Sequence, residues 1–385
     1  MAYYFLFPEK DTTIYSHPDR TKMNTGGDEI LEIVKEKGNS DQRYYPSRIL
    51  IKFKNEEIKS VISDIIGSSK FNDGVTISSL QLSTTEHKNL TNTLNLETFA
   101  VSQSWNEGSG RFTNIPLTSN GSSWTYRDND ISKTQWTTSS FATATTGSIN
   151  ASGIAVGGGE WYTGSLFQGS QQFLRGSNMD VNLDVTSIVQ KHSASLFVGQ
   201  TYPTGINNNG FIIKQPNVIE ENTSSSFGEM QYFSTDTHTI YPPKLTFKWD
   251  DSSYSIGSGT VLNSGDIFLS LYNNKKTFQR KSKQRFRLTT RKRYPDRTFT
   301  TTSNYLNVQY LPITSYYSLR DGETDEIIIP FDTSFTKLSA DSEGMYFDLY
   351  MEGLQPERYY KIMFRSDNSD GVQIFDEDYT FKIVR

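Results

Sequence analysis

The sequence predicts an all-β protein built of two β-sandwiches in tandem. Aromatic residues make up 13% of the 385 residues, and together with the many Ser and Thr residues they favour strands over helices. Short strand-like segments recur between turn residues, as is typical of antiparallel sandwiches. The length suits two or three domains. We expect an N-terminal jelly-roll β-sandwich followed by an immunoglobulin/fibronectin-like β-sandwich.

The first domain is expected to span residues 1–250 and to contain one long helix. Apolar residues between Asn55 and Ile66 recur at the spacing of an amphipathic helix, which Gly67 ends. A single helical turn is expected at Asp184–Val189. The predicted strands are Ala2–Phe7, Ser47–Phe53, Val75–Leu82, Leu94–Gln103, Val181–Asp184, Ser195–Gln200, Gly210–Lys214 and Pro243–Trp249. Residues 106–176 predict long surface loops.

The second domain is expected at residues 261–385, after a linker at residues 251–260. The linker combines acidic residues with Ser and Gly, which mark a turn or a flexible connection. Seven strand-like segments in about 125 residues match the size of an immunoglobulin-like sandwich. These segments are Asp266–Tyr272, Gln284–Thr290, Tyr305–Tyr310, Glu326–Phe331, Met345–Met351, Arg358–Phe364 and Tyr379–Val384.

Basic residues gather in the first third of the second domain, with aromatic residues between them. The candidate interface residues there are Lys281, Lys283, Arg285, Arg287, Arg291 and Arg293. Residues 321–352 are predominantly acidic, so the domain has two regions of opposite charge. Such regions favour head-to-tail contacts with copies of the chain or with a neighbouring protein. A solvated face is the alternative, and the net charge of −5 argues against nucleic acid.

Two tryptophans are candidate glycan-stacking residues. Trp124 and Trp161 lie in Ser-, Thr- and Gly-rich tracts beside Tyr126 and Tyr162, and exposed aromatic rings of this kind stack on sugars. The alternative is that both rings are buried in the core. The N-terminal segment Met1–Pro8 is a further candidate for contacts, because it has the character of a strand that adds to a neighbour.

The sequence gives no indication of catalysis. The absence of Cys excludes disulfides, thiolate zinc sites and cysteine nucleophiles. The four His residues have no metal-site spacing, and no nucleophile-elbow or zinc-protease motif occurs. We expect no catalytic residue, no cofactor and no metal, and therefore not an enzyme. No segment approaches the apolar length of a membrane span, and the N-terminus lacks the features of a signal peptide.

Several landmarks, taken in order, resemble the DNRLRE or disaggregatase-related family of jelly-roll domains, which is similar to one class of carbohydrate-binding module. They are Asp11–Tyr15, Ser47–Phe53, Ser104–Gly108, Ser123–Trp124, Gln135–Thr138, Asp184–Val189, Asn209–Lys214, and Phe233–Ser234 before Pro242–Leu245. The opening Phe7–Pro18 is similar to virion structural proteins of marine tailed phages, cyanophages in particular. The resemblance implies a jelly-roll fold and a place in a virus particle.

These observations predict a bacteriophage virion structural protein of the tail, baseplate or neck. It would be made in the host cytoplasm, released by lysis, and would contact other virion proteins and copies of itself. The alternative is a glycan-binding module that attaches a particle to a host cell surface. That alternative requires Trp124 or Trp161 to be exposed beside polar groups.

Overall fold

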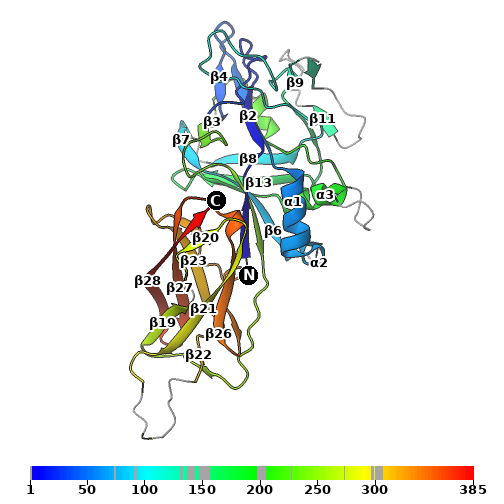
Figure 1. Ribbon diagram of the computed structural model, residues 1–385. Helices are drawn as coiled ribbons and strands as arrows, with labels where there is room; N and C mark the ends of the chain where they lie inside the picture. Colours follow the sequence, from blue (N-terminus) through cyan, green and yellow to red (C-terminus); the bar gives the residue numbers. More distant parts are fainter. Residues whose placement is uncertain are drawn as a thin grey trace. The chain divides into compact units, whose positions relative to one another are not determined.

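The computed structural model describes residues 2–72, 75–90, 93–130, 133–136, 144–146, 157–196, 205–226, 228–272, 274–295, 299 and 307–385. Strands make up 45% of it and helices 10%, so the predicted all-β fold class is confirmed (Figure 1). The chain divides into an N-terminal unit, Leu6–Thr246, and a C-terminal unit, Met1–Phe5 with Phe247–Arg385. The chain changes unit inside β1 (Ala2–Leu6) and inside β17 (Lys244–Trp249).

The two ends of the predicted first domain belong to the C-terminal unit. Met1–Phe5 is part of that unit, where the Tyr3 hydroxyl donates a hydrogen bond of 2.9 Å to Asp332 Oδ2. The segment expected as a linker is part of it too, since the Ser255 N–H donates to Ala340 O over 3.0 Å. The N-terminal segment, which was a candidate for contacts with a neighbouring molecule, therefore makes contacts within its own chain.

The N-terminal unit is organised around one antiparallel sheet with the strand order β13-β8-β15-β5-β2, to which β4 adds beside β5. A second sheet contains β6 between β14 and β17, and a third has the order β3-β16-β7. The strands are β2 (Lys10–Tyr15), β3 (Ile30–Ile33), β4 (Lys35–Lys37), β5 (Tyr44–Lys52), β6 (Ile77–Leu82), β7 (Thr84–Lys88), β8 (Thr93–Ala100), β9 (Tyr126–Asp128), β10 (Thr134–Gln135), β11 (Ala144–Thr146), β12 (Glu160–Tyr162), β13 (Gln168–Leu174), β14 (Val181–Asp184), β15 (Phe211–Lys214) and β16 (Glu229–Phe233).

The expected long helix forms at the residues that the apolar spacing indicates. It consists of α1 (Asn55–Ser60) and a π-helical continuation η1 (Val61–Ile66), and α2 (Ser68–Asn72) follows. The single helical turn expected at Asp184–Val189 is longer in the structure, where α3 spans Thr186–Leu196. The strand expected at Ser195–Gln200 was therefore wrong at its start, and its remainder lies outside the described residues. A short helix α4 (Asn217–Glu221) follows β15.

The central sheet buries both of its faces. The register places Phe211 opposite Ile51, and the Phe211 ring contacts His192 of α3 at 5.5 Å between centroids. Because side chains of a strand alternate, the next residue, Ile212, lies on the other face with Leu50. That second face is covered by the tryptophan-bearing loops. Surface loops were expected here, and the loops in fact supply a second hydrophobic core.

The C-terminal unit has the strand order of an immunoglobulin-type sandwich. One sheet contains β19, β21, β26 and β25, with β22 and β18 at one end, and the other has the order β20-β28-β27-β23-β24. β19 pairs antiparallel with β21, whereas β20 pairs parallel with β28. The elements are β18 (Thr260–Val261), β19 (Ile267–Tyr272), β20 (Thr277–Gln279), β21 (Lys283–Lys292), β22 (Gln309–Tyr310), β23 (Ser315–Asp321), β24 (Ile327–Ile329), β25 (Ser339–Asp341), β26 (Gly344–Tyr350), η3 (Met351–Gly353), β27 (Tyr359–Asn368) and β28 (Gly371–Val384).

Aromatic rings fill the space between the two sheets of this unit. The Phe347 ring of β26 stacks on Tyr317 of β23, with 4.6 Å between centroids, and lies 5.8 Å from Phe364 of β27. The Tyr360 hydroxyl donates 2.9 Å to Gln355 O, five residues upstream, which is the tyrosine corner of such sandwiches. The sequence missed β18, β20, β23 and β25, and it truncated β28. The strand expected at Tyr305–Tyr310 forms only as β22, and its first two residues lie outside the described residues.

Candidate functional site

The six basic residues singled out in the sequence lie on or beside one strand. Phe286, in the middle of β21, is buried and its ring stacks on Phe347 in the core. Because side chains alternate along a strand, the odd-numbered residues of β21 point outward. The set comprises Lys283, Arg285, Arg287 and Arg291 on the strand, with Lys281 and Arg293 just beyond its ends. We call these six residues the basic face; β21 alone is about 33 Å long.

The neighbouring strand supplies a carboxylate to two of these cations. The register places Arg285 directly opposite Asp348 of β26. Its Nε and Nη2 donate to the two carboxylate oxygens over 2.8 and 3.0 Å, and Lys283 Nζ lies 3.2 Å from Oδ2. Burial raises the pKa of Asp348, but the hydrogen bonds from Arg285 and Lys283 outweigh it and hold the pKa below the ordinary value.

A second carboxylate pair fixes Arg287. Its Nη1 and Nη2 each donate 2.9 Å to Asp341 at the end of β25, and Nη2 also lies 2.9 Å from Glu343. The hydrogen bonds from Arg287 lower the pKa of Asp341. These acidic residues belong to the stretch that the sequence analysis treated as a separate, opposed region. That part of the reasoning was wrong, because strand pairing brings Asp341, Glu343 and Asp348 beside the basic residues.

Aromatic rings lie between the cations. The Arg285 guanidinium carbon lies 4.1 Å from the ring centroid of Tyr346, and Arg291 lies 4.7 Å from that of Phe268. Lys283 Nζ is 4.8 Å from the Tyr350 ring. Such contacts contribute about 0.5–1 kcal/mol each at exposed sites and restrict the rotation of the long side chains. The face is therefore held in a defined arrangement of cations, rings and carboxylates.

A positive charge remains after these pairings. The six cations of the basic face against the three carboxylates beside them leave it a net charge of +3. Lys281 and Arg293 are exposed. Neither they nor Arg291 has an ion-pair partner among the residues that the structure describes. Fields of this size act beyond direct contact and steer partners of opposite charge.

The two candidate glycan-stacking tryptophans are buried. Trp124 is 0% exposed and Trp161 is 4% exposed, so neither ring is available to a sugar. Both lie in the cluster that covers the second face of the central sheet. The Arg48 guanidinium carbon lies 4.6 Å from one ring and 5.0 Å from the other. The prediction of stacking sites at these two residues was therefore wrong, and the core alternative was correct.

A buried ionic triad lies under these rings, and the sequence analysis missed it. Arg48, Lys214 and Glu220 each have side chains that are 1% exposed. Arg48 Nε and Nη2 donate 3.0 and 2.6 Å to the Glu220 carboxylate, and Lys214 Nζ lies 3.2 Å from Oε2. Arg48 also donates 2.7 Å to Gly158 O in the covering loop. The sequence signal that could have revealed the triad was one basic residue among apolar residues in each of two predicted strands, Arg48 in Ser47–Phe53 and Lys214 in Gly210–Lys214.

Two neighbouring carboxyl groups in the N-terminal unit have raised pKa values. Asp11 of β2 is buried, and burial raises its pKa to about 7 although the N–H and hydroxyl of Thr235 donate to its Oδ2 over 2.7 and 2.8 Å. Burial also raises the pKa of Glu107 to about 7, and Glu107 Oε1 accepts the Asp11 N–H over 2.9 Å. The pair joins three segments of the unit.

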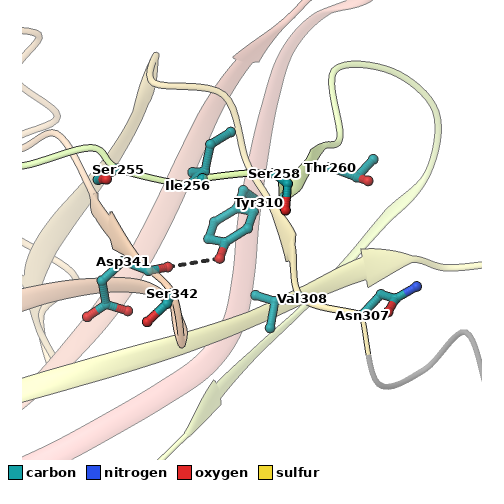
Figure 2. A pocket seen from close by; sticks show the side chains of 11 residues that line it. Ser255, Ile256, Ser258, Thr260, Asn307, Val308, Tyr310, Asp341 and Ser342 are labelled. Atoms are coloured by element: carbon teal, nitrogen blue, oxygen red, sulfur yellow. Dashed lines mark hydrogen bonds between the residues drawn. The ribbon is translucent and has the colours of Figure 1, made fainter.

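A pocket of the C-terminal unit lies between the segment 255–260 and β22 (Figure 2). Its lining carries mainly hydroxyl and amide groups, with the buried Tyr310 ring among them; the polar lining residues include Ser255, Ser258, Thr260, Asn307 and Ser342. The Tyr310 hydroxyl donates 2.8 Å to Asp341 O, as the dashed line shows. The Asp341 carboxylate is already engaged by Arg287, so the pocket offers a ligand polar uncharged groups.

Over the described part of the chain, no cluster of three His, Asp or Glu residues could hold a metal ion. In the same residues, no helix is long and apolar enough to cross a membrane. The basic face brings cations, carboxylates and aromatic rings together on one sheet, and it is therefore our candidate functional site.

No protein-family model matches the chain, and no curated protein matches it significantly.

Proposed function

We propose that this chain is a structural protein of a bacteriophage particle, in the tail, baseplate or neck, and that its basic face docks on an acidic surface of another protein. The composition of this face supports the docking, and the resemblance of Phe7–Pro18 to virion structural proteins supports the place in a particle. Arg and Tyr are the residues enriched at protein interfaces, and here Arg285, Arg287 and Tyr346 are packed together on one sheet. Pre-ordered side chains lose less entropy on binding.

The charge pattern supports a protein partner over a polyanion. Asp341, Glu343 and Asp348 lie among the cations, and they would repel the phosphates of nucleic acid or the sulfates of an acidic glycan. A protein surface can place a cation opposite each carboxylate and a carboxylate opposite each remaining cation. The net charge of +3 on the basic face then favours partners of predominantly acidic character.

The test is incorporation of the chain into virus particles. Lys281→Glu with Arg293→Glu reverses two exposed charges that make no ion pair within the described residues, so the fold should persist. We expect about tenfold less of this variant in purified particles, because like charges would then meet at the contact. The matched control is Lys70→Glu with Arg175→Glu, two exposed residues of the N-terminal unit, which should be incorporated like wild type.

Two results would contradict the proposal. Equal incorporation of the basic-face variant and the control would show that the basic face does not mediate the docking. Absence of the wild-type chain from particles would refute the structural role, and binding of the isolated chain to an array of acidic glycans would favour attachment to a host surface instead.

A further inference from the structure

The C-terminal unit carries an acidic surface on the sheet opposite the basic face. The exposed residues of β28 and of the turn between β23 and β24 include five carboxylates, which we call the acidic face: Glu323, Asp325, Asp376, Glu377 and Asp378. Asp376–Asp378 forms a bulge, because the register with β27 shifts between Ile362 and Phe364. A bulge turns side chains out of the regular alternation and presents them to solvent.

The two faces lie on opposite sides of one sandwich. The rings of Phe286 and Phe347, from the sheet of the basic face, contact those of Phe381 and Phe364 from the other sheet. Residues that point away from this shared core on the two sheets must therefore point in opposite directions. The unit has a positive side and a negative side.

The acidic face keeps a negative charge after its internal pairings. Lys361 Nζ lies 2.9 Å from Asp376, and its pKa is raised by that hydrogen bond and further by Asp325 and Asp378. Arg320 pairs with Asp325 over 2.8 Å. Glu323 and Glu377 are exposed. They have no basic partner in the described part of the chain.

Each face also offers apolar area beside its charges. Ile327 is 54% exposed and lies opposite Arg320 in the sheet, and Ile374 is 56% exposed and lies opposite Arg365. On the positive side, Tyr272 is 62% exposed and lies opposite Arg287. Apolar side chains among charged ones are the usual make-up of a protein interface, with an apolar centre and a polar rim.

From these observations we infer that the basic face of one copy of this chain docks on the acidic face of a second copy. This inference rests on the proposed function and names the partner of the same face. Because the two surfaces differ, each copy that uses one of them leaves the other available. Such a head-to-tail contact continues into a ring where the rotation closes, or into a stack or fibre where it does not.

Two charge-reversed variants of the full chain test the inference by sedimentation velocity. The first is the basic-face variant Lys281→Glu with Arg293→Glu. The second, Glu323→Lys with Glu377→Lys, reverses the acidic face. At about 100 μM, enough for micromolar affinities, wild type should form oligomers that dissociate in about 1 M salt, where the Debye length falls to about 3 Å. Each variant alone should be monomeric, and the Lys70→Glu, Arg175→Glu control should associate like wild type.

Mixing the two variants is the decisive step. The first keeps an unaltered acidic face and the second keeps an unaltered basic face, so an equimolar mixture should recover that one contact and form a one-to-one dimer. Wild type that stays monomeric, or a mixture that stays monomeric while wild type associates, overturns the head-to-tail contact. The proposed function survives that outcome if the basic-face variant still fails to enter particles, since the acidic partner would then be a different protein.

Discussion

Replacing Glu220 by Gln tests whether the buried ionic triad stabilises the N-terminal unit. The carboxylate accepts three charge-assisted contacts, from Arg48 over 2.6 and 3.0 Å and from Lys214 over 3.2 Å. Glutamine keeps the shape and loses the charge, so two cations whose side chains are 1% exposed would lose the carboxylate they share. Removing one partner of a buried ion pair costs about 3–5 kcal/mol, and we expect Glu220→Gln to lower the free energy of unfolding by that amount.

Urea unfolding followed by tryptophan fluorescence measures this change. Trp124 and Trp161 lie beside Arg48, and four of the five Trp residues lie in the N-terminal unit, so the signal reports mainly on that unit. The control is Glu221→Gln on the same helix, which is exposed and should change stability by less than about 0.5 kcal/mol.

The reasoning about the triad fails if Glu220→Gln folds normally and loses less than about 1 kcal/mol. A further variant separates charge from packing. Arg48→Met, Lys214→Met and Glu220→Leu together replace the triad by apolar side chains of similar size. This combination should be more stable than Glu220→Gln alone, because no unpaired charge stays buried.

Three other substitutions give direct tests. Asp11→Asn should weaken the pH dependence of the melting temperature of the N-terminal unit: burial raises the pKa of Asp11 to about 7 in the folded state from 3.8 in the unfolded chain, so wild type should lose stability as the pH rises from about 4 to about 7. An unchanged pH profile in the variant would contradict this. Trp124→Ala should destabilise the same unit by about 3–5 kcal/mol in urea unfolding, and a loss below about 1 kcal/mol would mean that the ring is not packed as described. Tyr360→Phe should cost the C-terminal unit about 1 kcal/mol, read as faster amide hydrogen exchange in β27, because the hydrogen bond from the Tyr360 hydroxyl to Gln355 O is removed.

The sequence predicted the elements that local patterns encode. The helix at Asn55–Ile66 and the strand Gln284–Thr290 were recognisable because apolar residues repeat at the spacing of each structure. The basic residues of β21 were recognisable as a group because they lie close together in the chain.

Long-range pairing could not be read from local patterns. Arg285 and Asp348 are 63 residues apart, and their ion pair depends on the register of β21 with β26. The burial of Trp124 likewise depends on loops folding over a sheet face that carries Arg48. Polar and small residues dominate those loops, so their composition indicated surface, and the tryptophans alone indicated a core.

The most direct measurement of the central claim is quantitative mass spectrometry of purified virus particles, with labelled peptides of this chain as standards. We predict a fixed copy number per particle that is a multiple of the particle's axial symmetry, as expected of a built-in component. Absence of the chain from particles, or an amount that falls with each purification step, would contradict the account.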